Sequence, residues 1–173
     1  IEPNVVLAKE CKPIPVEIVV RGYITGVTTT SAWHHYQKGE RIFAGVKLPE
    51  GMRKNQKFEK PIITPSTKAE HGKHDITISG EEIIKKRIVT EKLYREMEKV
   101  SLKLFERGAE ICAKNGLILV DTKYEFGLDA DNKLTLIDEM HTPDSSRFWI
   151  KSSYKELFEK GQEPEKLDKE YVR

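Results

Sequence analysis

The stretch over residues 117–149 constrains the fold of this chain most strongly. It begins with an apolar run and then places Asp121, Lys123 and Glu125 at every second position. Because side chains alternate across a β-strand, these three charges share one face of the strand that we expect here. A polar turn and a second apolar run follow, and that run ends at Asp138. The stretch therefore predicts a β-hairpin with acidic side chains gathered at one end.

The acidic residues of this hairpin allow two interpretations. Carboxylates that are held close together repel one another unless a cation lies among them. Glu125 and Asp138 on neighbouring strands could therefore hold a hard divalent ion, while Lys123 could neutralise one acid or reach a phosphate. Alternatively, the same residues form a solvated sheet face with ordinary cross-strand ion pairs. The alternation by itself does not choose between these interpretations.

The segment that follows the hairpin, residues 142–149, favours the first interpretation. It combines turn formers, hydroxyl side chains, an acid and an arginine in a short loop. The planar guanidinium of Arg147 suits a phosphate group, and serine hydroxyls and loop amides would complete such a site. The segment therefore predicts a phosphate-binding loop beside the hairpin.

Two segments of this region, DTKYEFG and LIDEMHTPDSSRFW, resemble the paired signature of the SAICAR synthetase family. The resemblance runs nearly from end to end of the chain but covers only the middle and later part of the family's length. It implies an α+β fold in which an antiparallel sheet is backed by helices, similar to the second lobe of ATP-grasp and kinase-like enzymes. We expect one domain over residues 1–173, truncated at both ends and lacking the family's N-terminal lobe, because the chain starts without methionine and ends in a helical pattern without a stop signal.

The resemblance also implies a reaction. Members of this family are ATP-dependent ligases that join L-aspartate to the carboxylate of 5-amino-1-(5-phosphoribosyl)imidazole-4-carboxylate, abbreviated CAIR, and so form SAICAR in purine biosynthesis. Phosphorylation turns the CAIR carboxylate into an acyl phosphate, which the aspartate amine then attacks. The expected cofactors are ATP and Mg²⁺, and the expected partners are CAIR, L-aspartate and ATP. Two alternatives stay open: a non-catalytic fragment that binds a nucleotide or phosphate, and a related ATP-dependent carboxylate–amine ligase.

The resemblance assigns roles to individual residues. It implies that Glu125 and Asp138 are magnesium ligands. It implies that Asp121 and Lys123 are catalytic residues close to the imidazole and the transferred phosphoryl group. It implies substrate contacts for a further set of residues: Arg21, Ser31, Lys68, Asp75, Asp144, Ser146 and Arg147. No residue is assigned as the general base for the amine.

Arg21 illustrates what the resemblance adds to the residues themselves. It follows a strand-like run over residues 15–20 and precedes Gly22 and Gly26, which is a layout common in anion-binding sites. The residues alone favour a surface arginine before a turn. The resemblance instead makes Arg21 a ligand of the ribose phosphate, with Ser31 as its partner.

The rest of the chain predicts the elements that surround this site. Ser79 opens a capping box, so a short helix is expected after it, and another is expected near residues 33–36. A long helix is expected from about residue 90 to 114, and its apolar stripe consists of Leu93, Met97, Val100, Leu104 and Ile111. Two segments are expected to be loops, residues 37–60 with one short strand at 42–43, and residues 61–75. A last helix is expected over residues 153–160.

Composition excludes some classes of function. The 173 residues carry a formal net charge of only +2, from 30 basic and 28 acidic side chains that are dispersed along the chain, so we expect no nucleic-acid partner. No apolar run approaches the length of a membrane span, and no membrane association is expected. The two cysteines lie far apart in the sequence, which favours a reducing, cytoplasmic location. The family resemblance, and not the composition, implies self-association into a homo-oligomer.

Overall fold

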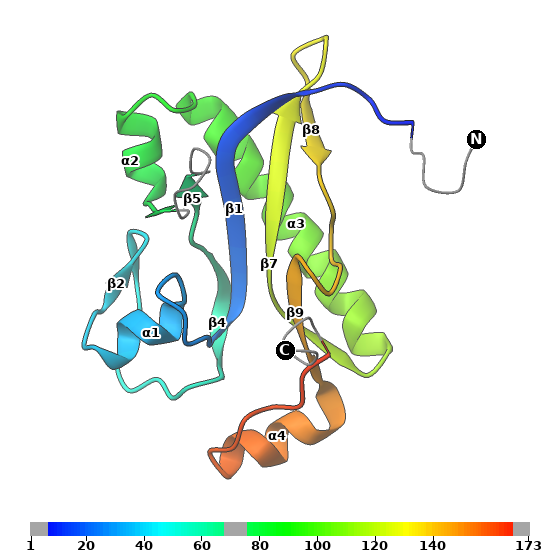
Figure 1. Ribbon diagram of the computed structural model, residues 1–173. Helices are drawn as coiled ribbons and strands as arrows, with labels where there is room; N and C mark the ends of the chain where they lie inside the picture. The colour runs from blue at the N-terminus through cyan, green and yellow to red at the C-terminus, as the bar shows by residue number, and fades with distance from the viewer. Residues whose placement is uncertain (1–6, 68–75, 168–173) are drawn as a thin grey trace.

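A computed structural model describes residues 7–67 and 76–167 (Figure 1). Its centre is an antiparallel sheet in which the two longest strands lie side by side, β1 (Lys12–Ile24) and β7 (Leu117–Leu128). Val16, Ile18 and Val20 of β1 are almost fully buried. Their alternation along the strand directs one face of β1 toward the core, as the run of β-branched residues predicts.

Shorter strands extend the sheet on both sides of this central pair. The strands on the β1 side are β4 (Gln56–Ile63), β5 (Ser66–Thr67) and, beside β5, β6 (Ile76–Thr77). The strands on the β7 side are β8 (Leu134–Ile137) and β9 (Ser146–Ile150). Glu125 of β7 pairs with Ile137 of β8, directly before Asp138, so the predicted hairpin is confirmed.

Helices cover and flank the sheet. The long helix α3 (Glu91–Lys114) packs against one face of β1 and β7, and Thr90 caps its first turn (Figure 1). The short helix α2 (Gly80–Lys85) begins at the predicted capping box, in which Ser79 and Glu82 exchange hydrogen bonds. Two more helices lie near the lower end of the sheet in Figure 1, α1 (Ala32–Gln37) and α4 (Lys151–Glu159). The expected α+β architecture is therefore confirmed.

The apolar stripe of α3 differs from the predicted one. The buried positions are Tyr94, Met97, Ser101, Phe105 and Gly108, and the predicted leucines and valine flank this line. The next position along the line, four residues after Gly108, is the partly buried Cys112, so Ile111 turns away and stays 47% exposed. The prediction that Ile111 faces the core was therefore wrong.

The segment expected to be a long loop is more ordered than its polar sequence suggests. It forms a small ribbon of β2 (Ile42–Phe43) and β3 (Val46–Lys47) and then enters β4. Together with α1 it builds a second hydrophobic cluster: Ile24, Ala32, Tyr36, Phe43, Leu48, Met52 and Phe58. The strand character of β4 is concealed in the sequence by its exposed polar residues and proline, which are Lys57, Glu59, Lys60 and Pro61. The loop prediction was therefore wrong over residues 56–63.

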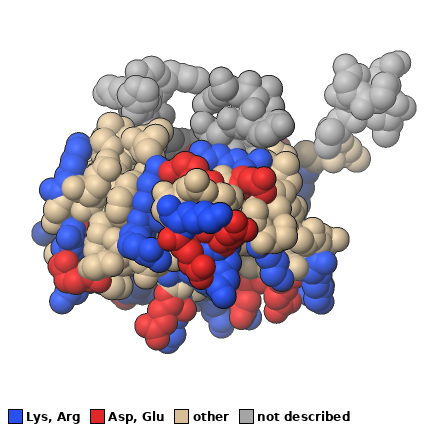
Figure 2. All heavy atoms as spheres, turned by 90° about the horizontal axis from the view of Figure 1, so that it is seen from below, with Lys and Arg blue, Asp and Glu red and all other residues tan. Residues whose placement is uncertain are grey.

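The surface shows no broad region of one charge on the face seen from below. Figure 2 shows basic and acidic side chains interspersed over the described residues of that face. Within the described ranges, no helix combines the length and the apolar character needed to cross a bilayer.

Candidate active site

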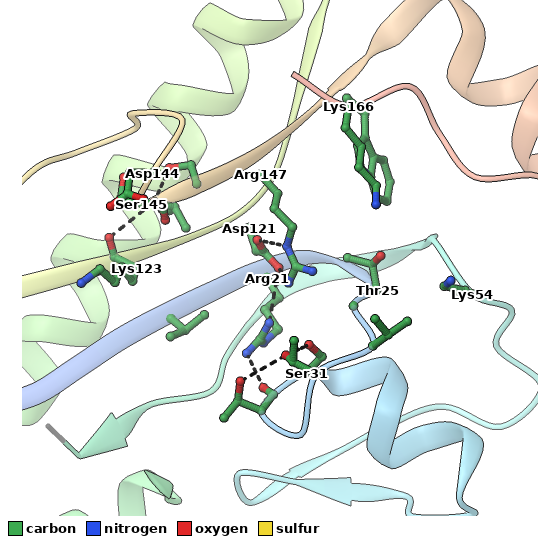
Figure 3. A pocket seen from close by; sticks show the side chains of 18 of the residues that line it. Arg21, Thr25, Ser31, Lys54, Asp121, Lys123, Asp144, Ser145, Arg147 and Lys166 are labelled. Carbon is green, nitrogen blue, oxygen red and sulfur yellow. Dashed lines mark hydrogen bonds and ion pairs between the residues drawn. The ribbon is translucent and has the colours of Figure 1, made fainter. Parts of the chain in front are cut away.

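Most of the predicted site residues converge on one cavity of about 390 Å³ (Figure 3), but the predicted magnesium ligands Glu125 and Asp138 are not among its described lining residues. Its walls come from β1 and the loop after it, from β7, from β9 and from the segment after α4. The cavity is lined by all the predicted catalytic and substrate-binding residues in the described ranges: Arg21, Ser31, Asp121, Lys123, Asp144, Ser146 and Arg147. Lys68 and Asp75 lie outside the described residues, so their assignment stays a prediction.

An arginine cluster of Arg21, Arg147 and Asp121 lies at the centre of the cavity. Strand register creates it, because Asp121 of β7 is paired with Arg21 of β1 on one side and with Arg147 of β9 on the other. Arg21 Nη1 lies 3.3 Å from Asp121 Oδ2, and Arg147 Nε donates to Asp121 Oδ1 at 2.8 Å. Arg147 Nη2 also bonds to Asp121 Oδ2. One carboxylate thus holds two guanidiniums, a combination suited to an anion such as phosphate.

Arg21 is fixed by further contacts. Its Nε donates to Thr64 Oγ1 at 2.8 Å, and its Nη2 donates to the carbonyl of Thr30 at 3.1 Å. Burial lowers the pKa of the Arg21 guanidinium to about 10, with the charge of Asp121 opposing this shift and that of Arg147 adding to it. Arg21 therefore remains protonated at neutral pH, in an orientation that folding sets in advance.

The loop after β1 folds over the arginine cluster at Gly26. This residue has φ of +87°, and a Cβ placed there would lie 2.3 Å from Ser31 Oγ and 2.7 Å from Arg147 Nη1. Only glycine allows both the left-handed backbone and the close approach. Ser31 is held in turn by a 2.7 Å hydrogen bond between its hydroxyl and that of Thr28. Ser31 and Arg147 thus both lie against Gly26, while the partnership of Ser31 with Arg21 that the resemblance implies stays a prediction.

A second group of charges, the carboxylate cluster, lies further along β7. It consists of Lys123 with Glu17, Glu125 and Asp138. The Lys123 ammonium lies 2.7 Å from Glu125, 3.3 Å from Glu17 and 3.6 Å from Asp138. Glu17 is paired directly across from Glu125 in the β1–β7 register. Burial acts to lower the pKa of Lys123, but the hydrogen bond to Glu125 and the charges of Glu17 and Glu125 outweigh it and raise the pKa above 10.5.

The carboxylate cluster fits a hard cation. Three acidic side chains, two of them buried, already surround one ammonium group. In the described ranges, no three histidine, cysteine or acidic side chains are arranged to hold a metal ion by themselves. Mg²⁺ is commonly bound by one or two protein carboxylates that are completed by substrate phosphates and water. Glu125 and Asp138 could supply such carboxylates, and their assignment as magnesium ligands stays a prediction.

The loop from Asp138 to Ser146 connects the two clusters. Its later part is tied to β7, since the Lys123 amide donates to the Ser145 carbonyl at 3.2 Å. The Ser146 hydroxyl donates to Thr122 Oγ1 at 2.7 Å. Ser145 and Ser146, which the sequence assigned to a phosphate-binding loop, therefore both bond to β7. Ser146 therefore serves at least partly to fix the loop.

Sequence reasoning missed several residues of this site. Glu17 was passed over as part of a strand, although a single acid in an otherwise apolar, β-branched run is a recognisable signal. Lys54 and Lys166 also line the cavity, and Lys54 forms an ion pair with Glu163. Their local sequence is that of ordinary polar loops, so only the tertiary structure reveals them.

Comparison with known proteins shows which protein family the chain resembles. The family model described as SAICAR synthetase matches residues 1–173. The phosphoribosylaminoimidazole-succinocarboxamide synthase of Legionella pneumophila (strain Paris) is 52% identical over 172 residues, which cover 99% of this chain and 54% of that protein. The chloroplastic synthase of Arabidopsis thaliana is 52% identical over 170 residues, covering 98% of this chain and 41% of that protein.

Solved structures of SAICAR synthases have folds similar to that of this chain. The SAICAR synthase from Saccharomyces cerevisiae complexed with SAICAR gives a TM-score of 0.71 at 41% identity, covering 84% of this chain and 44% of that one. A SAICAR synthetase in complex with ADP gives a TM-score of 0.65 at 26% identity, covering 87% and 57%. The chain spans about half the length of the curated relatives it matches. On the matching family model and these relatives, the chain belongs to the SAICAR synthetase family.

Proposed function

We propose that this chain provides the substrate-binding part of an ATP-dependent ligase that joins L-aspartate to CAIR and forms SAICAR. The observation that carries the proposal is the arginine cluster, in which guanidiniums from two strands meet on Asp121 inside a cavity. The cavity volume of about 390 Å³ lies in the range that small-molecule sites occupy. Family membership and the relatives solved with SAICAR and with ADP support the same reaction.

The chemistry requires a carboxylate to become an electrophile. The CAIR carboxylate oxygen takes the γ-phosphoryl group of ATP, and ADP leaves. The aspartate nitrogen then attacks the acyl carbon, and inorganic phosphate leaves with the transferred oxygen while the amine loses a proton. Because like charges meet in the first step, most of the catalytic effect comes from positioning and from neutralising charge.

The residues of this chain divide that work between the two clusters. Arg21 and Arg147, with Ser31, bind the 5′-phosphate of CAIR and hold the imidazole in register. Lys123, next along the strand from the arginine cluster, stabilises charge on the transferred phosphoryl group. Glu125 and Asp138 would hold Mg²⁺, which would supply positive charge to neutralise the phosphates. Asp144 and Ser146 shape the wall between the clusters.

The test is a comparison of Michaelis constants in the protein encoded by the complete reading frame. Arg21→Ala, and Arg147→Met as a more exposed second variant, should raise KM for CAIR roughly tenfold or more while KM for ATP stays within about twofold. Arg95→Ala is a matched control, because Arg95 is an exposed arginine on α3 that pairs with Glu91 and Glu98. Equal changes in both Michaelis constants would rule out a ribose-phosphate role for the cluster.

A second measurement separates the alternatives that the sequence leaves open. ADP release that requires both CAIR and L-aspartate supports the ligase, and no ADP release supports a fragment that only binds phosphate. Turnover with other amines in place of aspartate would indicate a related carboxylate–amine ligase.

A further inference from the structure

His141 is a half-buried residue that the proposed mechanism does not use. Its Nε2 and the Tyr124 hydroxyl are joined by a 2.6 Å hydrogen bond. The two rings also meet edge to face, with centroids 5.6 Å apart and an interplanar angle of 67°. Neither residue is among those that line the cavity within the described part of the chain. The pair therefore acts on the site only through other residues.

The His141 ring also rests on α3 at Gly108. A Cβ added to Gly108 would lie 2.3 Å from Cε1 and 2.7 Å from Nδ1 of His141, which is too close for any side chain. Glycine in a helix interior costs about 1 kcal/mol relative to alanine. A glycine at this position in a long helix is thus explained by the imidazole that occupies the space.

The backbone around His141 needs this support. Asp138 and His141 both adopt left-handed conformations, with φ of 63° and 56°. For residues other than glycine this conformation is unfavourable and persists only when surrounding contacts hold it. The later part of the loop is tied to β7 by Ser145 and Ser146, as described above. His141 provides the corresponding attachment for the part that carries Asp138.

We propose that His141 is a positioning residue whose contacts with Tyr124 and Gly108 fix Asp138 within the carboxylate cluster. Tyr124 then attaches the earlier part of the loop to β7. Thr122 and the Lys123 amide attach the later part. The kinetic consequence rests on the proposed function, because Asp138 is assigned there to Mg²⁺. Losing the His141 contact frees Asp138 while leaving the arginine cluster intact.

The first experiment measures the effects of His141 substitutions on Mg²⁺ affinity and on KM for CAIR separately. It uses the protein encoded by the complete reading frame. His141→Ala should weaken the apparent affinity for Mg²⁺ roughly 10- to 100-fold, as loss of a residue that orients a metal ligand typically does. KM for CAIR should stay within about twofold. His141→Gln should recover part of the loss, since its amide reaches the position of Nε2, and Tyr124→Phe should reproduce it. Equal effects on Mg²⁺ and CAIR, or no effect on Mg²⁺, would overturn the proposal.

The second experiment uses Gly108 and needs no catalytic activity. Gly108→Ala should destabilise the protein in urea unfolding although alanine favours helix, because the methyl group displaces the imidazole. In the His141→Ala background the same substitution should be neutral or stabilising, so the two changes are strongly coupled. Equal effects of Gly108→Ala in both backgrounds would contradict the contact. If the unfolding coupling is found but CAIR- and aspartate-dependent ADP release is absent, the proposed function fails while the positioning contact stands.

Discussion

The arginine cluster and the carboxylate cluster lie on the same strand, β7, and are built in opposite ways. In the arginine cluster two cations share one carboxylate, whereas in the carboxylate cluster three carboxylates surround one ammonium. The first is held in register by three neighbouring strands. The second is more open, since the side chain of Lys123 is 34% exposed and that of Asp138 is 46% exposed.

One strand can therefore present two kinds of binding site. Excess positive charge in a rigid, buried setting suits a phosphate that must be held in one place. Excess negative charge around a partly exposed ammonium suits a metal ion that binds together with a nucleotide. Along β7, the net charge of the side-chain cluster changes from positive around Asp121 to negative around Glu125. Substitutions can therefore be expected to separate the two clusters.

The largest expected effect is on stability, through Asp121. Asp121→Asn removes the charge that two arginines share, and breaking a buried ion pair in this way costs about 3–5 kcal/mol. Urea unfolding measures the loss directly. Asp131→Asn in the exposed turn of the hairpin is the control and should change little. A small effect at Asp121 would show that the arginine cluster does not depend on its carboxylate.

The next effect is on turnover, through Glu125. Glu125→Ala should lower magnesium-dependent kcat roughly 10²- to 10³-fold, because charge on the phosphoryl group is no longer neutralised. The protein should still fold, since Lys123 keeps Glu17 and Asp138 as partners. Glu156→Gln on α4 serves as a surface control. Near-normal turnover of Glu125→Ala would refute the metal assignment and remove the functional contrast between the clusters.

A smaller effect is expected from two glycines that share a backbone conformation but differ in their surroundings. Gly26→Ala should weaken binding of SAICAR about tenfold, or about 1.4 kcal/mol, because its Cβ would displace Ser31 and Arg147. Gly39 has a similar φ of +92° but nothing within 4 Å of an added Cβ, so Gly39→Ala carries the same strain without that collision. Calorimetric titration of both variants isolates the contribution of the close approach. Equal losses would attribute the effect to backbone strain alone.

The smallest effect is a pH dependence of stability that comes from the loop between the clusters. Burial lowers the pKa of His141 below its ordinary 6.5. The unfolded chain therefore binds a proton at His141 before the folded chain does, and stability should fall as pH decreases from 6.5 toward the folded pKa. Unfolding midpoints at pH 7 and pH 5.5 in His141→Gln, compared with the wild type, measure this contribution. An unchanged pH dependence in the variant would assign it to other groups.

The sequence predicted the parts of this site that depend on local pattern. Alternation placed Asp121, Lys123 and Glu125 on one strand, and the capping box at Ser79 marked the start of α2. The resemblance added Arg21 and Ser31, which lie far away in the sequence. Neither source indicated that Asp121 would hold both arginines, because that contact depends on the register of three strands.

Other features were hidden for related reasons. Glu17 joins the carboxylate cluster only because β1 and β7 pair at that residue. Ile111 fits a helical apolar period, but the direction of the buried face is set by the packing of Tyr94 and Phe105 against the sheet. The role of Gly108 follows from a loop more than thirty residues later in the chain. In each case tertiary packing, and not local propensity, decides the outcome.

One binding measurement tests the central claim most directly: titration of the protein with SAICAR and with its 5′-dephosphorylated ribonucleoside, in the wild type and in Arg147→Met. The account predicts that removing the phosphate weakens binding to the wild type roughly 100-fold, and that this difference shrinks to about tenfold or less in the variant. Equal affinities of the wild type for both compounds would show that the guanidiniums on Asp121 do not bind the sugar phosphate.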